Sequence, residues 1–501
     1  MIEGLVSGFF QAVSLDVFPF LFVGAVFGLV IGVIPGLSGH FAMAMVIPFL
    51  YTMDPGPGIA FLLGAHSTVA QGGGLTAILF STPGTGQNAA TLLDGPPMRD
   101  KGLAGLATGA AMASCFLGAL FGALVLVMLI PVLQQVVLFF GPPEIFVLAI
   151  LALTFVAVLG KQDLTRSMIA GLSGLLLAMV GVDNVTNQER FTFGLLDLRD
   201  GLALVPVILG LFAVAEIIHL WMRGSFAGGT AMHTHSAKET QKQIFQGIAA
   251  AFRHWWLILR CSAIGATMGL IPGLGSAPAA FVAYGHAKQT SKSKDTFGKG
   301  NIEGVIGSEA ANDAVEGGAL ASTIAFGIPG SSSMGILLAG FFILGLETGP
   351  NMITYNLDIV FLMLFSIVIG NLIGTIFGLF LVNPLSRATG LRASILVPVL
   401  LVVVFTGAFA VHRSGFDIGV AIVFGILGYL MKELGYSRAA MLIGFVLGFA
   451  VEKNLYLALQ ISGPYFLLDP IPLTLAIITL AFLGYNVWTI IRDKRRLKAN
   501  A

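Results

Sequence analysis

Residues 31–37 read Ile-Gly-Val-Ile-Pro-Gly-Leu, and residues 268–274 read Met-Gly-Leu-Ile-Pro-Gly-Leu. Each stretch places a Pro-Gly pair in an apolar run, where proline removes a backbone donor and glycine permits angles that other residues resist. Inside hydrocarbon the freed backbone groups need partners, so such a break persists only where protein or a wet cavity surrounds it. The two stretches therefore predict broken membrane helices that face protein rather than lipid.

A second pair of breaks follows the first pair in the same order. Residues 80–85 read Phe-Ser-Thr-Pro-Gly-Thr, and residues 326–331 read Phe-Gly-Ile-Pro-Gly-Ser. The prolines of the first pair are 237 residues apart, and those of the second pair are 246 residues apart. Because order and spacing are both kept, we interpret the chain as an internal duplication, a common feature of transporters.

The overall composition indicates an integral membrane protein. Of the 501 residues, 56% are hydrophobic and only 10% are charged, whereas an ordinary soluble domain has about 25% charged residues. Apolar stretches of about 20 residues, long enough to cross a bilayer, recur along the chain. A very hydrophobic soluble protein is the alternative, but it could not bury this much apolar surface. The net charge of +1 gives no reason to expect nucleic acid as a partner.

The N-terminal residues and the two cysteines allow two further predictions. Residues 1–14 lack a basic start and an obvious cleavage site, so we expect no cleavable signal peptide. Cys115 and Cys261 both lie in apolar runs, and we expect them to be packing residues rather than a disulfide.

We predict an all-α, polytopic membrane protein with about 10–14 membrane segments. Short polar connections separate the apolar segments, and one long polar stretch lies in the middle of the chain. The predicted parts are a first membrane repeat at residues 1–222, a polar cytoplasmic linker at 223–256, a second membrane repeat at 257–491 and a basic cytoplasmic tail at 492–501.

The basic residues indicate that the two halves point in opposite directions. Lysine and arginine near segment ends mark the cytoplasmic side. The loop at 288–299 is rich in lysine, but its first-half counterpart at 51–58 has no basic residue. Conversely, Arg99 and Lys101 follow the second break of the first half, whereas the matching loop around Glu347 has none. We therefore predict two inverted repeats with re-entrant or Pro-Gly-broken helices; alternatively, each early Pro-Gly pair joins two full-length helices.

The residues beside the breaks predict a site for an anion. Serine and threonine follow each break and are good N-caps, and a helix N-terminus offers free N–H groups and a partial positive charge. Several such ends together would hold carboxylates without a buried lysine or arginine. The candidate substrate-binding residues are Pro35, Gly36, Ser38, Gly39, Pro83, Gly84, Thr85, Pro272, Gly273, Gly275, Ser276, Pro329, Gly330, Ser331 and Ser332. The alternative is that the breaks are kinks for close packing, with the hydroxyls bonding back within each helix.

The polar stretch at 308–318 predicts a cation site. It contains three carboxylates and an amide just ahead of an apolar run, and ionisable groups at membrane depth are usually functional. Asn312 and Asp313 are the candidates for coupling to Na⁺ or H⁺. Alternatively, the carboxylates, including Glu309 and Glu316, lie at an interfacial helix start and favour its dipole. In the first half, His66 either binds substrate or is a structural hydrogen-bonding group.

These motifs resemble the large membrane subunit of the tripartite tricarboxylate transporter family, over nearly the whole chain. The resemblance rests on residues 32–37, 83–85, 91–98, 101–102, 269–273, 309–314 and 327–331. The sequence departs from the family pattern in two places. Gly86-Gln87-Asn88 stands where small residues are more usual, and Asp94-Gly95 is followed by Pro96-Pro97 rather than by an aromatic residue and a proline. Both departures bear on substrate choice or assembly.

The resemblance implies a multi-pass permease of the bacterial inner membrane, driven by a cation gradient. It implies two partners, a small membrane subunit and a periplasmic solute-binding protein, and substrates such as citrate, other di- and tricarboxylates or aromatic acids. We predict a secondary active importer of a small organic anion that has no catalytic residue, metal or cofactor, apart from Na⁺ or H⁺ as coupling ion. A passive anion channel is the alternative. A membrane enzyme is disfavoured because no nucleophile or metal cluster is evident, and no phosphate-binding loop for ATP occurs.

Overall fold

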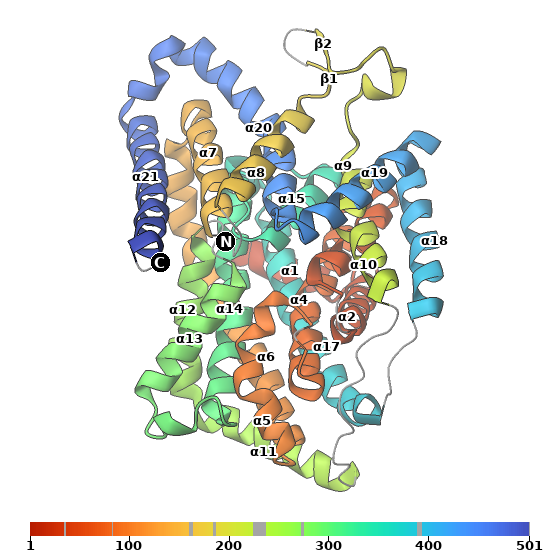
Figure 1. Ribbon diagram of the computed structural model, residues 1–501, viewed down its shortest axis with the longest axis vertical. Coiled ribbons are helices and arrows are strands. Elements are labelled where there is room, and N and C mark those ends of the chain that lie inside the picture. The colour runs from red at the N-terminus through yellow and green to blue at the C-terminus, as the bar shows by residue number, and fades with distance from the viewer. Residues whose placement is uncertain are drawn as a thin grey trace. The chain divides into compact units, whose positions relative to one another are not determined.

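Helices make up almost all of the structure, a computed structural model that describes residues 1–34, 37–82, 84–159, 164–183, 187–223, 237–271, 275–387 and 393–499. This architecture confirms the predicted all-α class (Figure 1). Within the described residues, strands occur only where β1 (Gly181–Val182) pairs antiparallel with β2 (Glu189–Arg190). The chain forms two compact units: Met1–Gln134 with Ala203–Leu430, and Gln135–Leu202 with Met431–Ala501. The predicted repeat boundaries stay a prediction.

The first unit contains the helices next to all four Pro-Gly breaks. Its first part consists of α1 (Ile2–Ala12), α2 (Phe18–Val33), α3 (Gly39–Val46), α4 (Pro55–Phe80), α5 (Gly95–Asp100) and α6 (Ala104–Val136). Its second part consists of α9 (Leu204–Ile208), α10 (Ala215–Arg223), α11 (Ala237–Arg253), α12 (Trp255–Leu270), α13 (Ser276–Thr290), α14 (Ile302–Phe326), α15 (Ser332–Ile343), α16 (Pro350–Tyr355), α17 (Leu357–Arg387), α18 (Ala393–His412) and α19 (Gly415–Glu433). In this unit α12, α13 and α14 lie side by side (Figure 1).

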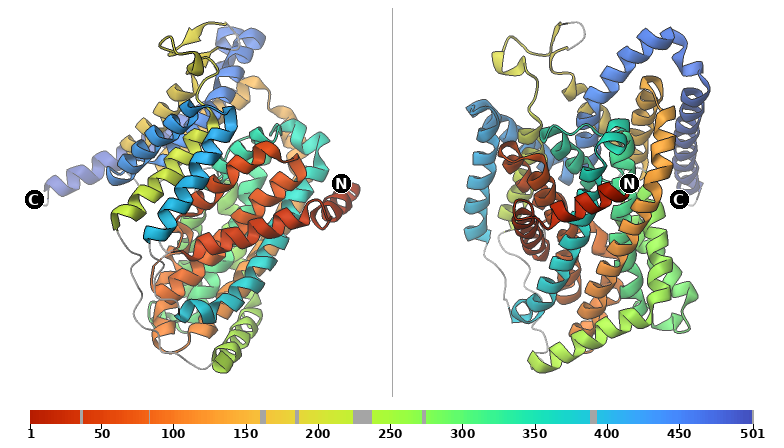
Figure 2. Two further views of the ribbon diagram at one scale, coloured as in Figure 1. Left: turned by 90° about the vertical axis from the view of Figure 1, so that its right-hand side faces the viewer. Right: turned by 180° about the vertical axis from the view of Figure 1, so that it is seen from behind.

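The second unit is built around one long helix. It consists of α7 (Pro142–Leu159), α8 (Leu164–Ala178), the strand pair, α20 (Arg438–Ser462) and α21 (Pro470–Ala499). α20 packs against α7 and α8, and α21 lies along α7 (Figure 2). Arg190 donates hydrogen bonds of 2.5 and 3.0 Å to the two carboxylate oxygens of Glu452, which fixes the strand pair to α20. The predicted basic tail continues α21 as far as Ala499.

Several helices are long and apolar enough to cross a bilayer. Among the described residues they are Ala104–Phe139, Leu204–Met222, Leu357–Val382, Gly415–Glu433 and Arg438–Leu468. Further apolar helices of 10–17 residues accompany them, including α2 and α12. A helix of 16 residues is about 24 Å long, which is short of the roughly 30 Å hydrocarbon core. The chain is therefore a multi-pass membrane protein, and the number of its crossings stays a prediction.

The two halves repeat the same helix–helix contact. α2 packs along α4, and α12 packs along α14. A Cβ added at Gly32 would lie 2.3 Å from the carbonyl oxygen of Val69, and one added at Gly269 would lie 2.2 Å from that of Val315. The glycines are 237 residues apart and the valines 246, which are the spacings of the Pro-Gly breaks. The duplicated sequence thus makes duplicated backbone contacts, whereas the inversion of one repeat stays a prediction.

α4 and α14 are the buried helices of the first unit. Every residue of α14 from Gly304 to Ala325 is buried, and α4 is almost as completely covered from Gly58 to Leu79. Polar side chains on these helices therefore meet protein rather than lipid. Each helix ends in a left-handed residue, Ser81 with φ 53° and Gly327 with φ 66°, just before its Pro-Gly break.

The predicted polar linker contains a helix. Residues 224–236, which include His233 and His235, lie outside the described residues, but α11 occupies most of the rest of the linker. Gln243 of α11 donates a 2.9 Å hydrogen bond to the carbonyl of Gly102 and accepts one of 3.2 Å from the N–H of Gly105. The second half of the linker is thus packed against the start of α6.

Asp94, in the motif that departs from the family pattern, fastens the first half of the chain to the second. Its Oδ1 accepts hydrogen bonds of 2.8–2.9 Å from the N–H groups of Gly298, Gly300 and Asn301, and its Oδ2 accepts one of 2.8 Å from the Tyr284 hydroxyl. The carboxylate is fully buried, and these donors satisfy it. Asp94 therefore holds the loop before α14 in place.

Candidate functional site

A cavity of about 160 Å³ lies in the first unit, where the stretches after all four breaks meet. It is lined by Ser38, Gly39, His40, His66, Val69, Ala70, Thr85, Gly86, Gln87, Gly275, Ser276, Ala277, Ser331, Ser332 and Ser333. These residues come from four separate stretches of chain that follow the four Pro-Gly pairs, and from the middle of α4. The volume is below the roughly 300–1,000 Å³ of pockets for drug-sized ligands, which favours a small ligand.

The N-termini of α3, α13 and α15 converge on this cavity. The Ser38 hydroxyl oxygen accepts a 3.3 Å hydrogen bond from the N–H of Phe41, and the Ser331 hydroxyl oxygen accepts one of 3.2 Å from the N–H of Met334. Both serines are therefore N-caps, as the sequence predicts. α13 begins differently, because Gly275 stands at its N-cap position with φ 68° and Ser276 is its first residue. Three helix ends with partial positive charge surround one space.

The break at Thr85 differs from the prediction that a new half-helix begins there. A four-residue 3₁₀ helix, Gly86–Ala89, follows instead of an α-helix. The Thr85 hydroxyl donates a 2.6 Å hydrogen bond to Oδ1 of Asn88 rather than capping a helix. This side-chain bond competes with helix formation, so Thr85 lines the cavity but contributes no helix dipole.

The remaining predicted substrate residues fall into two groups. Gly84, Pro329 and Gly330 do not line the cavity. The N–H of Gly84 faces the carbonyl oxygen of Gly73 at 3.4 Å, and that of Gly330 faces the Thr323 hydroxyl at 3.4 Å, so these glycines join each break to the preceding helix. The other group, Pro35, Gly36, Pro83, Pro272 and Gly273, lies outside the described residues.

His66 brings a polar pair to the cavity wall. Its Nε2 lies 2.6 Å from Oε2 of Glu316, and the two side chains are 5% and 7% exposed. His66 extends from α4 and Glu316 from α14, so the pair joins the two repeats. Removing one partner from a buried pair leaves the other unsatisfied. The pair places an imidazole with a fixed partner at the wall of the cavity.

The charge pattern of the cavity favours an anion. Among its described lining residues there is no lysine, arginine, aspartate or glutamate. The Ser276 hydroxyl is buried and has no hydrogen-bond partner within the described residues, so a donor stands ready for a ligand oxygen. Helix ends, hydroxyls and an imidazole together can bind a carboxylate without a buried cationic side chain.

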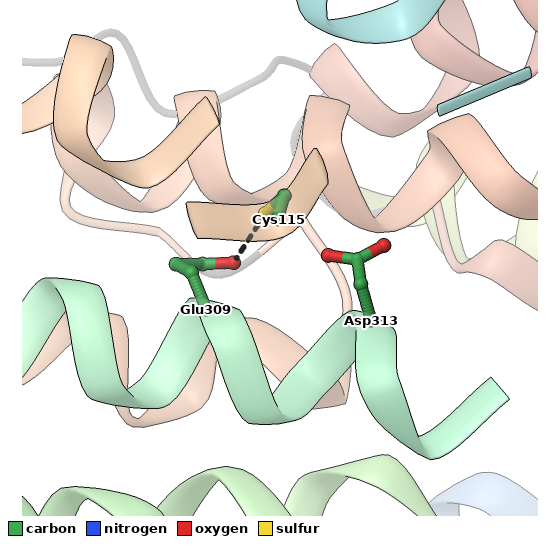
Figure 3. Close-up of side chains that lie close together, drawn as sticks. All are labelled: Cys115, Glu309 and Asp313. Carbon is green, nitrogen blue, oxygen red and sulfur yellow. Dashed lines mark hydrogen bonds between the residues drawn. The ribbon is translucent and has the colours of Figure 1, made fainter. Parts of the chain in front are cut away.

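Glu309 forms the centre of a second polar cluster, deeper in the first unit. It is fully buried and accepts hydrogen bonds from Asn88 at 3.3 Å, from the Cys115 thiol at 3.3 Å and from the hydroxyl of Thr91. Figure 3 shows Glu309 and Asp313 projecting from one face of α14 toward Cys115 on α6. One ligand atom of each of these three residues lies within 4.8 Å of the others.

The predicted cation residues are part of this cluster. Asn312 and Asp313 are 1% and 2% exposed, and the amide nitrogen of Asn312 lies 3.5 Å from Oε2 of Glu309. Asp313 stands about three turns from the start of α14. The alternative that these carboxylates sit at an interfacial helix start is therefore wrong, because the chain around them is buried on all sides.

Sequence analysis missed several partners in this cluster. Asn88 and Thr91 could have been suspected from the sequence, because both follow the second break and lie in or close to the first-half family motif. No feature of the sequence indicated a role for Cys115, because a cysteine in an apolar run resembles any packing residue. Cys115 and Cys261 are both free thiols, as predicted, but only Cys115 contacts a carboxylate.

The chain resembles known proteins along most of its length. The sequence profile described as "Tripartite tricarboxylate transporter TctA family" matches residues 18–443. The chain is 32% identical over 501 residues to the "Uncharacterized 52.8 kDa protein in TAR-I ttuC' 3'region" of Agrobacterium vitis, covering 99% of this chain and 98% of that protein. It is also 32% identical over 234 residues to the "Uncharacterized protein in TAR-II ttuC' 3'region" of the same organism, covering 46% of this chain and 97% of that protein.

Proposed function

Because the chain belongs to the tripartite tricarboxylate transporter TctA family, we propose that it is the permease of a cation-coupled importer for a small organic anion. Family membership makes it the membrane component of a tripartite transport system, and not an enzyme. The proposed substrate is a di- or tricarboxylate or a related carboxylic acid. The proposed setting is the bacterial inner membrane.

The convergence of three helix N-termini on one small cavity carries the proposal. α3, α13 and α15 come from both halves of the duplication, and their first residues line a space without a described charged carboxylate or ammonium group. A carboxylate placed there would accept hydrogen bonds from backbone N–H groups and from Ser276. An uncharged or cationic substrate would gain nothing from these partial charges.

The proposed mechanism is alternating access between two inverted repeats. The anion would bind in the cavity, and Asn312 and Asp313 would couple its movement to Na⁺ or H⁺. The proposed partners are a small membrane subunit and a periplasmic solute-binding protein that delivers the substrate. Rocking of one repeat against the other would expose the cavity to each side in turn.

Uptake into proteoliposomes tests this function. The permease is reconstituted with its small membrane subunit, loaded binding protein is added outside, and radiolabelled citrate, succinate and benzoate are tried in turn. We expect accumulation of one of these acids above its external concentration when an inward Na⁺ or H⁺ gradient is imposed. The matching ionophore should abolish it. Flux that only runs downhill and ignores the ionophore would instead establish a passive anion channel.

Substitution at Ser276 links the flux to the cavity. Ser276→Asp adds a negative charge beside the proposed carboxylate position, so uptake should fall to background while Ser276→Ala retains measurable transport. Because Ser276 is nearly fully buried, gel filtration and thermal unfolding of each variant serve as the folding control. Equal transport by both variants would place the anion path elsewhere.

A further inference from the structure

Glu309 is the better hydrogen-bonded of two neighbouring buried carboxyl groups on α14. Four side chains donate to its carboxylate: Asn88 at 3.3 Å, the Cys115 thiol at 3.3 Å, Asn312 at 3.5 Å and the Thr91 hydroxyl. A carboxylate that accepts several hydrogen bonds is stabilised in its ionised form. These four bonds offset part of the free-energy cost of burying the Glu309 side chain.

Asp313, one turn further along α14, has fewer partners, with the Cys115 thiol as a hydrogen-bond partner of its carboxyl group. Its Oδ2 is buried and has no hydrogen-bond partner within the described residues, and the same holds for Oδ1 of Asn312. Both oxygens can accept, so the missing partner is a hydrogen-bond donor or a cation, and a carboxyl group buried here must be neutralised by a proton or by a bound cation. Among the described residues no lysine or arginine pairs with Glu309 or Asp313. An uncompensated buried carboxylate is too costly to persist.

The hydrogen bonds of the described residues do not indicate a proton shared by the two carboxyl groups. A shared proton would join them by a hydrogen bond, and none connects Glu309 with Asp313 in the described chain. Their oxygens nevertheless lie within 4.8 Å of each other. Ca²⁺, which is close in size to Na⁺, keeps its oxygen ligands about 2.3–2.6 Å away, so two ligands across such an ion are at most about 5 Å apart. The gap suits an ion of that size.

We propose that Glu309 and Asp313 form a binding site for one Na⁺ ion, with Asn312 at its edge. This inference rests on the proposed cation-coupled transport and adds Glu309 and the identity of the ion to it. A monovalent ion fits because two carboxyl groups this close do not both ionise readily, so the pair offers about one negative charge to be compensated. The hard oxygen donors favour Na⁺ over a soft transition metal, although the Cys115 thiol is nearby.

The same geometry connects the ion to the anion cavity. Nδ2 of Asn88 donates to Glu309, and Oδ1 of Asn88 accepts the 2.6 Å hydrogen bond from Thr85, which lines the cavity. Gly73 and Gly74 allow this approach, since a Cβ at Gly73 would lie 2.4 Å from Oδ1 of Asn88. An ion that draws Glu309 toward Asp313 would shift Asn88, and Thr85 with it. Asn88 is thus a positioning residue between the two sites.

Thermal unfolding of the purified full-length chain in detergent tests the ion site. Unfolding is followed in NaCl, KCl and choline chloride at one pH and one ionic strength. We expect a saturable rise in Tm with Na⁺ only. Asp313→Asn should abolish this rise and unfold in choline at a higher temperature than the wild type, because it removes the uncompensated charge. Glu309→Gln should raise the half-saturating Na⁺ concentration by roughly 10- to 100-fold.

Glu303→Gln is the matched control. Glu303 is in the first turn of the same helix, is partly exposed and lies outside the cluster, so its response to Na⁺ should equal that of the wild type. An equal rise in Tm with K⁺, or an unchanged Na⁺ response in Asp313→Asn, would overturn the proposal. A rise that follows acidity instead of Na⁺ would overturn it in favour of a proton.

A separate measurement of ligand binding tests the link through Asn88. With citrate as probe, or whichever acid is transported, Na⁺ should tighten anion binding and the anion should tighten Na⁺ binding by the same factor. Asn88→Ala should bring this factor close to one while both ligands still bind. An unchanged factor would refute the link. If the wild type takes up the acid against its gradient but does not bind Na⁺, the ion site is refuted and the transport function stands. If the wild type binds Na⁺ but shows only downhill flux, the transport function is refuted and the ion site stands.

Discussion

α4 and α14 occupy equivalent places in the duplicated chain, but they carry different chemistry. Both are buried, both pack a neighbouring helix through glycines, and both end in a left-handed residue before a Pro-Gly pair. With the repeat spacing of 246 residues, the three buried carboxylates of α14 correspond to Leu63, Ser67 and Ala70 on α4. α4 instead contributes His66 to the wall of the cavity.

The difference shows which features the duplication keeps and which it leaves free to change. Backbone contacts such as those at Gly32 and Gly269 are fixed in both halves, because any side chain there would collide with a carbonyl oxygen. The charged side chains differ, because the three buried carboxyl groups of α14 have no acidic counterpart on α4. The anion cavity consequently draws on helix ends from both repeats, whereas the acidic cluster is specific to the second. The ion site is an asymmetric addition to a symmetric frame.

The largest expected effect comes from adding a methyl group at the equivalent glycines. Gly32→Ala and Gly269→Ala each place a Cβ 2.2–2.3 Å from a backbone carbonyl oxygen, and backbone cannot move aside as a flexible side chain can. We expect each to destabilise the fold by about 1–3 kcal/mol or more. Tm and the monodisperse fraction on gel filtration measure the loss.

Gly285→Ala is the control for these variants, because a Cβ there meets nothing within 4 Å. It should unfold like the wild type. If the Tm values of the alanine variants at Gly32 and Gly269 differ strongly, the two halves do not pack their helices in the same way. If both resemble Gly285→Ala, the close contact between the helices is absent.

An intermediate effect is expected at the His66–Glu316 pair, where the two central helices meet. His66→Ala removes the imidazole from the cavity and leaves the buried Glu316 without its 2.6 Å partner. Since a hydrogen bond to a charged group contributes about 1.5–3 kcal/mol, the KM for the transported acid should rise roughly 10- to 100-fold. His66→Gln, which can still donate to Glu316, should recover part of the loss. Equal values for the two variants would mean that the pair does not shape the cavity.

The smallest effect should come from the N-caps that face the cavity. Ser38→Ala and Ser331→Ala each remove one cap, which stabilises a helix by about 1 kcal/mol, so each should weaken anion binding about fivefold. Ser437→Ala is the matched control, since Ser437 caps α20 through a 3.1 Å hydrogen bond from Ala440 outside the cavity. It should lower Tm without changing KM. Loss of anion affinity in this control would show that the caps act through stability alone.

Much of the cavity could be predicted because its determinants are local. A Pro-Gly pair in the middle of an apolar run disfavours a continuous helix, and a serine just after it is a good cap, as Ser38 and Ser331 show. Thr85 was harder to predict. Its hydroxyl had two available partners, and the choice of Asn88 over a helix N–H depends on Asn88 being held by Glu309, which is 221 residues away in sequence.

The sequence by itself determined the membrane class, the duplication and the four breaks, because composition, spacing and backbone restriction act over short stretches of chain. Only the tertiary structure decided that His66 meets Glu316, that Cys115 faces Glu309 rather than lipid, and that Asp313 is left with an unpaired oxygen. These outcomes depend on distances between helices that are remote in sequence. Burial then determines which polar groups are paired and which require a ligand.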